Sequence, residues 1–515
     1  MSNLKIIIGS RGSRLALWQA NHIKEKLTLT GLESEIKIIK TKGDQFQHLS
    51  FDKIEGKGFF TKELEIALIK EEIDLAVHSL KDLETQQPKE LSIAAVPIRE
   101  NPSDTLLINL NSVDKSQDLN IIKNGKIGTS SARRKNQLLL FREDLIIKDL
   151  RGNVPTRIQK LRDGYYDAIV LAKAGINRLN IDISDFHIID LSPMTFIPAP
   201  AQGALGIQTK NSNHKLKKFL NKLTDKETLD NVFFERKILE CIGGGCHSPM
   251  GAFSKIDKNG NRSTWVSYSE KIDKTPIRFL TYSNDISAIV DKVKNKTKNK
   301  KIWISRRLND KSIFRKLLTY NGHYISGQSL IEKEIIKINQ LPKCDWVFFN
   351  SIFSFDSVKE LKNNFLDKKI AAYGKSTASY LTKNGLNVDF IGKGSPNETS
   401  KRFKKVLKNT EIAFFPSSNR TIGTVQGILD EKNKIVLSTY KTTLIEASIK
   451  TNDFYVFTSP SNVEAFFKIN QLKNNKVISI GPSTTNRLKD FGVKVVNEAF
   501  ESTELALADV VFSLI

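Results

Sequence analysis

The stretch GKIGTSSARRKNQLLLF (residues 125–141) indicates the fold class of the first half of the chain. A short β-rich run leads into a turn of glycine and hydroxyl residues, and a helical pattern follows. The same order recurs in LIIKDLRGNVPTRIQKL (145–161) and in YDAIVLAKAGINRL (166–179). Repeated strands, polar turns and helix starts favour an α/β fold whose ligand groups lie at the turns.

Local patterns on either side extend this prediction. A strand is expected at KIIIGS (5–10), followed by a helix from Ser13 to Leu29. A further helix is expected to begin near Pro155, with Asn153 or Val154 as its cap. One long helix is predicted from about Leu216 to Leu239, leading into a glycine run. His78 lies in an apolar strand and is predicted to be structural.

Size and composition narrow the class of protein. A chain of 515 residues with 39% hydrophobic residues is expected to form three to four globular domains. No stretch is apolar enough to span a bilayer, and the N-terminus does not have the pattern of a secretory signal. Three cysteines cannot build a disulfide framework, and no zinc-ligand spacing is present. A cytoplasmic protein without a metal or a membrane partner is expected.

The net charge of +24 points to a polyanionic partner, either nucleic acid or a small molecule with many carboxylates. Nucleic-acid binding would require aromatic platforms among the basic residues or a known module, and neither is found. A periplasmic solute receptor would need a signal peptide. The arrangement of arginines favours a small polycarboxylate.

Four turns at predicted strand ends carry charged or hydroxyl groups. Any one of them alone would be an ordinary cap or a surface arginine. Together they provide the forked donors and helix N-termini that several carboxylates require. They contain Arg11 and Ser13; Lys81 and Asp82; Thr129, Ser130, Ser131, Arg133 and Arg134; and Arg151 and Arg157.

Asp82 and Cys246 are unusual in their surroundings. A carboxylate among basic groups helps an anion site only if positive charge develops on the ligand; otherwise Asp82 is half of a charge pair at a strand end. Cys246 lies in GGGCHSPMG (243–251), where glycines allow a thiol to approach a ligand and basic neighbours favour the reactive thiolate. Cys241 and Cys344 are predicted to pack inside the protein.

The second half contains an internal repeat. VFFNSIFSFDSV (347–358) resembles VFTSPSNVEAFF (456–467), and about 23 residues after each comes a strand, a Gly-x-Ser-Thr turn and a helix. The lysine-rich segment 292–301 precedes this half as a boundary. Two similar α/β lobes are expected.

Residues 4–290 resemble porphobilinogen deaminase, also called hydroxymethylbilane synthase, in RGSRLALWQ, AVHSLKD, GTSSARR, LRGNVPTR, AQGALGI and GGGCHSP. The resemblance implies a dipyrromethane cofactor held by Cys246 through a thioether, on which four porphobilinogen units are joined with loss of ammonia. Asp82 matches the family's catalytic carboxylate. One departure is Ala201, before Gln202, where glycine is common.

The same resemblance assigns the binding residues. Cofactor contacts are expected from Lys81, Thr129, Ser130, Ser131, Arg133 and Arg134. Substrate carboxylates are expected at Arg11, Ser13, Lys57, Arg151, Arg157 and Arg178. Porphobilinogen and linear tetrapyrroles are therefore the expected partners, with no nucleic acid, and a monomer is expected.

Residues 300–515 resemble uroporphyrinogen-III synthase in FTSPSNVEAF, its echo, the Gly-x-Ser-Thr turns and STYKTT. The resemblance implies ring closure with inversion of one pyrrole. It matches Tyr440 to the family's tyrosine near the cleft and Thr377 to a threonine at a helix start. Ser459, Ser483 and Thr484 are either carboxylate contacts or ordinary helix caps. The departures are Asn350, which replaces threonine, and the turn FPSSNR. An active deaminase with a degenerate second half is the alternative.

These resemblances imply a three-domain deaminase, with two periplasmic-binding-protein-like domains and a small α+β domain, followed by a two-lobed α/β synthase. The expected deaminase domains are 1–98 plus 199–215, 99–198 and 216–291. A linker at 292–299 leads to synthase lobes at 300–334 plus 442–515 and at 335–441.

Overall fold

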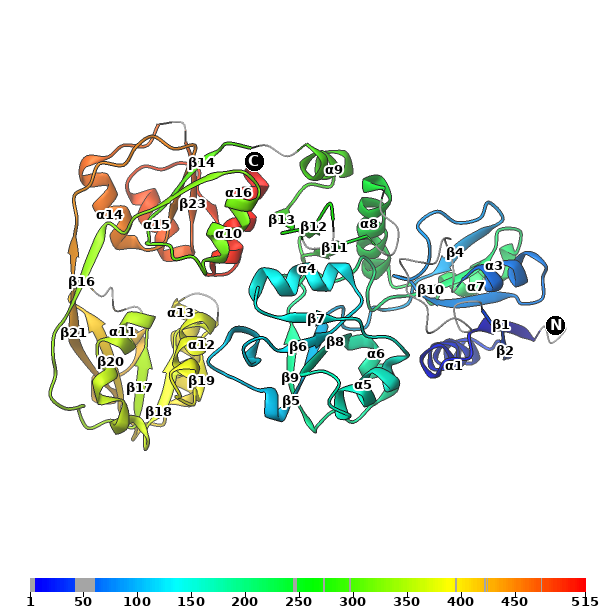
Figure 1. Cartoon of the computed structure of the whole chain (residues 1–515), viewed down its shortest axis with the longest axis horizontal. Coiled ribbons are helices and arrows are strands. Elements are labelled where there is room, and N and C mark those ends of the chain that lie inside the picture. Colours follow the sequence, from blue (N-terminus) through cyan, green and yellow to red (C-terminus); the bar gives the residue numbers. More distant parts are fainter. Residues whose placement is uncertain are drawn as a thin grey trace. The chain divides into compact units, whose positions relative to one another are not determined.

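The computed structural model describes residues 5–41, 61–243, 248–271, 274–295, 298–393, 396–420, 423, 425–473 and 475–515. The chain forms two compact units that divide at residue 298. Figure 1 shows their helices and sheets, and the predicted α/β class is confirmed. No helix among the described residues is long and apolar enough to cross a bilayer.

The first sheet of unit 1 has the order β2-β1-β3-β10-β4. Strand β1 pairs in parallel with β2 and β3, whereas β10 pairs antiparallel with β3 and β4. The strands are β1 (Ile6–Ser10), β2 (Ser34–Ile38), β3 (Leu75–Ser79), β4 (Leu91–Ala95) and β10 (Leu205–Lys210); the helices of this region are α1 (Arg14–Leu29), α3 (Lys62–Ile69) and α7 (His214–Asn221).

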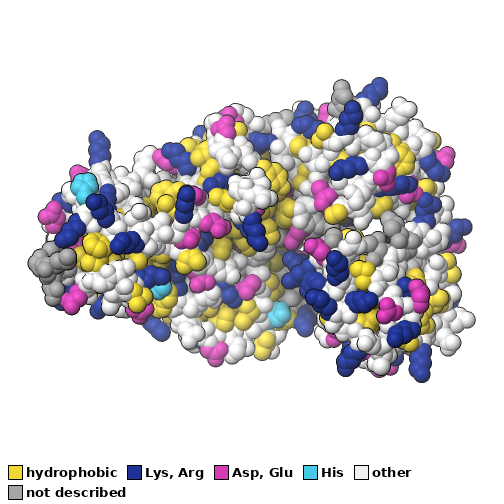
Figure 2. Space-filling model, turned by 180° about the vertical axis from the view of Figure 1, so that it is seen from behind, with side chains coloured by type: hydrophobic (Ala, Val, Ile, Leu, Met, Phe, Trp, Pro, Cys, Tyr) yellow, Lys and Arg dark blue, Asp and Glu magenta, His cyan; other side chains and the backbone are white. Residues whose placement is uncertain are grey.

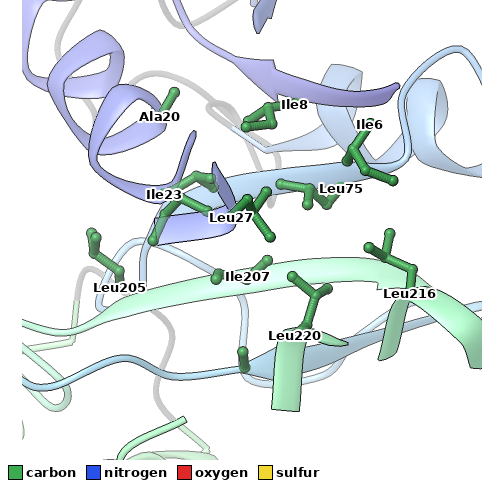
Figure 3. Close-up of a cluster of buried hydrophobic side chains, with 12 residues drawn as sticks. Ile6, Ile8, Ala20, Ile23, Leu27, Leu75, Leu205, Ile207, Leu216 and Leu220 are labelled. Atoms are coloured by element: carbon green, nitrogen blue, oxygen red, sulfur yellow. The ribbon is translucent and has the colours of Figure 1, made fainter. Parts of the chain in front are cut away.

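A single apolar cluster holds this sheet and two of its helices together. Figure 3 shows side chains from α1, α7 and the strands β1, β3 and β10 gathered in it. Ile8, Ile23, Leu75 and Ile207 are completely buried. Burying each such side chain stabilises the fold by about 1.5–3 kcal/mol, which fixes the strand ends where polar turns begin.

The second sheet repeats the pattern in the order β7-β6-β8-β5-β9. Strands β7, β6 and β8 are parallel, and β5 is antiparallel to β8 and β9. Its elements are β5 (Asp104–Asn109), β6 (Lys126–Gly128), α4 (Ala132–Phe141), β7 (Ile146–Lys148), α5 (Val154–Arg162), β8 (Ala168–Ala172), α6 (Lys173–Leu179) and β9 (Phe186–Leu191).

The chain crosses between these two sheets twice, first before β5 and again between β9 and β10. The second crossing contains the segment 199–204, which we call the crossover segment. After β10 and α7 come α8 (Lys226–Ile242), the antiparallel strands β11 (Met250–Ile256), β12 (Arg262–Tyr268) and β13 (Ile277–Thr281), and α9 (Ile286–Lys294).

The single helix predicted from Leu216 to Leu239 is wrong, because the structure has two helices there. Helix α7 ends at Asn221, and α8 begins after Asp225. The Asp225 side chain accepts a hydrogen bond from the Thr228 N–H at 2.8 Å, so it caps a new helix. Its own N–H donates to the Val96 carbonyl, a long-range contact that the helical pattern does not contain.

Unit 2 has two sheets, with orders β15-β14-β22-β23-β24 and β16-β21-β20-β17-β18-β19. The first comprises β14 (Lys301–Ile304), β15 (Tyr324–Gly327), β22 (Phe454–Phe457), β23 (Lys476–Ser479) and β24 (Asn497–Glu498), with α10 (Ile313–Tyr320), α14 (Pro460–Ile469), α15 (Pro482–Asp490) and α16 (Glu504–Leu514). The second comprises β16 (Ile331–Ile335), β17 (Trp346–Phe349), β18 (Lys369–Ala372), β19 (Phe390–Ile391), β20 (Ala413–Ser418) and β21 (Lys434–Leu444), with α11 (Ile352–Asp356), α12 (Lys375–Lys383) and α13 (Pro396–Val406).

The predicted repeat is confirmed at the level of its elements. Strand β17 and helix α11 correspond to β22 and α14, and the caps Ser351 and Ser459 accept N–H hydrogen bonds at 3.2 and 3.3 Å. Strand β18 and helix α12 correspond in the same way to β23 and α15. Each lobe therefore presents serine-capped and glycine-capped helix starts after its central strands.

Candidate functional site

The four polar turns of unit 1 follow strands β1, β3, β6 and β7. Carboxyl ends of parallel strands meet at one edge of a sheet, so the turns within each sheet lie together. Helices begin at three of these turns. Ser13, Ser131 and Asn153 cap α1, α4 and α5 by accepting N–H hydrogen bonds at 3.3, 3.5 and 2.9 Å. Helix N-termini of this kind favour anions.

The turns after β6 and β7 are joined through hydroxyl groups. The exposed Ser130 donates its hydroxyl to the Leu150 carbonyl at 3.2 Å and accepts the Leu150 N–H at 3.1 Å. Thr129 is buried, and its hydroxyl accepts the N–H of Ser131. These hydroxyls therefore order the turns that carry the basic side chains.

Arg133 and Arg134 bind one buried carboxylate. Arg133 Nη1 lies 2.8 Å from Oδ2 of Asp104, and Arg134 reaches Oδ1 with Nε at 3.1 Å and Nη2 at 2.7 Å. Burial opposes ionisation of Asp104, but the two guanidinium charges outweigh it and hold its pKa well below the ordinary value. Burial also lowers the pKa of Arg133. The pair is thus fixed inside the protein.

Asp82 is exposed and lies among cations. Burial lowers the pKa of Lys81, and the charges of Asp82 and Asp104 oppose that lowering. Burial likewise lowers the pKa of Arg157 to about 10, with Arg134 and Arg151 adding to the effect and Asp82 opposing it. These interactions link Lys81 and Asp82 of the first sheet with Arg134, Arg151 and Arg157 of the second.

Arg157, Arg178 and Arg11 are the remaining predicted arginines whose surroundings the structure gives. Arg157 donates from Nε to the Gly152 carbonyl at 2.6 Å, and Arg178 donates from Nη2 to the Gly203 carbonyl at 2.6 Å. Burial lowers the pKa of Arg178 to about 10. Arg11 is half-buried, and its charge reaches His78. Cationic groups that lack full solvation attract carboxylates strongly.

Cys246 and Lys57 lie outside the described residues. Helix α8 ends at Ile242, and Gly243 follows with a φ of 82°, in the left-handed region that favours glycine. Cys241 is half-buried, whereas Cys344 is buried and its pKa is raised by burial to about 11. A thiol with a raised pKa is a poor nucleophile. No cluster of metal-ligating side chains is found within the described part of the chain.

In unit 2 the structure brings Tyr440 together with residues of β16 and α11. Tyr440 is buried, and its ring lies 5.0 Å from that of Phe353. Burial raises the pKa of its hydroxyl, whereas a hydrogen bond with Ser351 lowers it by a smaller amount. The ammonium of Lys333 lies 4.8 Å from the Phe353 ring centre. This group combines a cation, aromatic faces and a hydroxyl.

The other residues predicted for unit 2 lie at helix starts. Thr377 and Thr484 are buried in α12 and α15, and Ser483 is exposed in α15. Ser459 is a helix cap whose hydroxyl also accepts from the Asn462 side chain at 2.9 Å. Asn350 has a buried side-chain oxygen without a hydrogen-bond partner among the described residues.

Sequence reasoning missed Asp104 and Gln202 in unit 1. Gln202 is completely buried; it donates to Asp104 and accepts from Lys81. A signal was available, because Asp104 opens the apolar strand DTLLIN. A buried carboxylate must be paired with a cation, and GTSSARR supplies two.

Surface charge is mixed on the face drawn in Figure 2. Figure 2 shows lysine and arginine side chains spread over this face among acidic and apolar ones. The informative cations are instead the partly or fully buried arginines described above.

Comparison with known proteins finds a family model for each half of the chain. Residues 6–218 match the family model described as "Porphobilinogen deaminase, dipyromethane cofactor binding domain". Residues 329–509 match the model "Uroporphyrinogen-III synthase HemD". The two matches, on an α/β fold, therefore define a two-part enzyme of porphyrin biosynthesis.

The relatives identify the first part in more detail. Porphobilinogen deaminase of Clostridium novyi is 44% identical over 261 residues, which are 50% of this chain and 85% of that protein. The deaminase of Maridesulfovibrio salexigens is 43% identical over 277 residues, 53% of this chain and 87% of that protein. The chain belongs to the porphobilinogen deaminase family.

The second part is similar to a solved uroporphyrinogen-III synthetase of Helicobacter pylori, with 19% identity and a TM-score of 0.33, covering 42% of this chain and 100% of that one. The two family models assign hydroxymethylbilane synthase and uroporphyrinogen-III synthase activities to the chain.

Proposed function

We propose that Cys246 holds the dipyrromethane through a thioether. Two observations support this: the family model that matches residues 6–218 is a dipyrromethane-binding domain, and in the sequence GGGCHSP (243–249) Cys246 directly follows a run of three glycines after α8. In the attachment step, Sγ of Cys246 bonds to the methylene carbon of a substrate pyrrole and the C–N bond from that carbon to its amino group breaks. The amino group takes up the proton that the thiol loses and leaves as ammonia. When bound, the dipyrromethane supplies the nucleophilic carbon to which substrate pyrroles are joined.

The donors of the described site suit such a group. Each pyrrole of porphobilinogen carries two carboxylates, so a growing chain needs many cationic and N–H donors. We assign the cofactor's carboxylates to Lys81, Thr129, Ser130, Ser131, Arg133 and Arg134. Substrate carboxylates are assigned to Arg11, Ser13, Lys57, Arg151, Arg157 and Arg178.

Asp82 is the proposed catalytic carboxylate, and its position carries the proposal. It is exposed, and its charge interacts with those of Lys81 and Arg157. An anion held among cations favours a cationic reacting group in a site that otherwise selects anions. Asp82 accepts a hydrogen bond from the pyrrole N–H and stabilises the positive charge that develops as ammonia leaves.

In unit 2 we propose that the linear tetrapyrrole contacts Tyr440, Thr377, Ser459 and Ser483. Support comes from the Tyr440 group and from the helix starts that follow the central strands of both lobes. We further propose that the enzyme works as a monomer in the cytoplasm, where a reduced Cys246 is available.

Intact-mass measurement of the purified chain tests the cofactor proposal. The adduct should equal two porphobilinogen molecules minus two ammonia molecules. Cys246→Ser should lack the adduct and deaminase activity, whereas the control Cys241→Ser should retain both. A fully active wild-type chain of unmodified mass would rule out the thioether.

A further inference from the structure

Asp104 is the centre of a buried network at the start of β5. It has no exposed surface, and its two carboxylate oxygens accept four hydrogen bonds. Three come from the guanidinium groups of Arg133 and Arg134, and the fourth comes from the side-chain amide of Gln202 at 3.0 Å. A carboxylate with this many charged donors fixes the orientation of each of them.

The same two arginines also donate hydrogen bonds to backbone carbonyls. Arg133 donates to the Ile197 carbonyl at 2.8 Å, and Arg134 donates to the Val170 carbonyl at 2.9 Å. Both guanidinium groups are therefore bound to β5, β8 or the second crossing. Little rotational freedom remains for side chains that are only 5% and 7% exposed.

Gln202 connects Asp104 of the second sheet with Lys81, which follows a strand of the first sheet. Its amide nitrogen donates to Asp104 and to the Pro102 carbonyl at 2.8 Å. With the nitrogen committed, its oxygen faces Lys81 and lies 3.5 Å from Nζ. Lys81 directly precedes Asp82 in the sequence. Gln202 belongs to the crossover segment, through which the chain passes from the second sheet to the first.

We propose that Asp104 is a positioning residue of the deaminase site: it orients Arg133, Arg134 and Gln202, and through Gln202 it places Lys81 beside Asp82. The inference rests on the proposed roles of Lys81 and Asp82. Asp104 itself touches no substrate. Its negative charge also leaves the arginine pair with one net positive charge instead of two, which limits how tightly a product with many carboxylates is retained.

The chain offers a matched control in the same sheet region. Arg142 binds Asp144 through two hydrogen bonds of 2.6 Å and donates to the carbonyls of Asp118, Ile121 and Ile122. This pair stabilises a loop and contacts none of the proposed site residues. Asp144→Asn therefore measures the effect of losing an ion pair without disturbing Lys81.

The test compares Asp104→Asn, Asp144→Asn and Gln202→Met in the full chain, with porphobilinogen as substrate. Asp104→Asn should lower kcat about tenfold or more and reduce the adduct found per folded chain, while Asp144→Asn should change neither. Gln202→Met keeps the ion pairs and removes the hydrogen bonds of Gln202 to Asp104, to the Pro102 carbonyl and to Lys81, so it should lower kcat with the adduct intact and KM little changed. The double variant Asp104→Asn/Gln202→Met should turn over no more slowly than Asp104→Asn alone.

Wild-type kcat and adduct in Asp104→Asn would overturn the inference, as would fully additive losses in the double variant. If Asp104→Asn does not fold, Gln202→Met decides, and normal kcat in that variant overturns the inference. A wild-type chain without the adduct would instead contradict the proposed cofactor attachment, so the two failures are distinguishable.

Discussion

The N–H of Ala201 donates a 2.7 Å hydrogen bond to Oε2 of Glu235, and Ala201 adopts a φ of 61°. Glu235 also binds Arg99 through two bonds of 2.8 and 3.0 Å, so it is a fixed anchor. Ala201, in the crossover segment, is therefore held in a left-handed conformation next to Gln202. Such a conformation is unfavourable for any residue with a Cβ.

Ala201→Gly should stabilise unit 1. The left-handed conformation costs a non-glycine residue about 1–2 kcal/mol, and loss of the buried methyl group costs about 0.8 kcal/mol. The balance predicts a gain of at most about 1 kcal/mol in the free energy of unfolding, measured by urea denaturation. Ala204→Gly is the matched control, since Ala204 is equally buried and lies outside the left-handed region. It should be destabilising; a loss of stability in both variants would contradict the strain argument.

Asp82→Asn should abolish most of the turnover while leaving the fold intact. The substitution keeps the size of an exposed side chain and removes the charge that stabilises a cationic reacting group. We expect kcat for porphobilinogen to fall by about 10²–10³-fold, with Tm near that of the wild type. Asp163→Asn, at the exposed C-terminal end of α5, is the control and should turn over normally. Near-normal turnover of Asp82→Asn would eliminate the proposed role.

His78 should make stability depend on pH. Burial lowers its pKa to about 4. The hydrogen bond to Gln208 raises the pKa, and the charges of Arg11 and Arg236 lower it further, but both effects are smaller than that of burial. The unfolded chain takes up this proton near pH 6.5, whereas the folded chain does not until about pH 4. Stability is therefore lost as pH falls through this window, by roughly 3 kcal/mol in total.

Denaturation at pH 7 and at pH 4.5 checks this expectation. His78→Gln should show a smaller loss of stability between the two conditions than the wild type. His214→Gln replaces an exposed histidine and should behave like the wild type. The same pH dependence in all three chains would show that His78 does not contribute.

Tyr440→Phe should impair unit 2 without affecting porphobilinogen consumption. It removes the hydroxyl that interacts with Ser351 and keeps the ring that packs on Phe353. Linear product that escapes the second site closes spontaneously to the type I isomer, so we expect a mixture of type I and type III uroporphyrinogen. Chromatography of the oxidised products measures the ratio. Tyr324→Phe, on an exposed strand, is the control; an unchanged ratio in Tyr440→Phe would remove the tyrosine from the site.

Local chemistry explains what the sequence predicts well. Asn153 caps a helix whose first turn contains Pro155, and Ser13 and Ser459 cap others, because caps depend on residues only a few positions away. The repeat in unit 2 could be read in the same way, since each copy carries its own strand, turn and helix start.

Long-range contacts explain what the sequence did not predict. Asp104 meets Arg133 and Arg134 about 30 positions later and Gln202 nearly 100 positions later. No local pattern encodes such distances. The strain at Ala201 likewise depends on Glu235, and the break between α7 and α8 coincides with a contact to Val96.

The division of one polypeptide into two compact units has a consequence for cellular economy. Two separate enzymes can be made in any ratio, but here every deaminase is translated together with one synthase. Gene dosage and promoter strength therefore change the number of deaminase units and the number of synthase units by the same amount. The proportion of linear product that is closed correctly must then be set by the relative turnover of the two sites, and selection for isomer purity acts on catalytic rates instead of on expression.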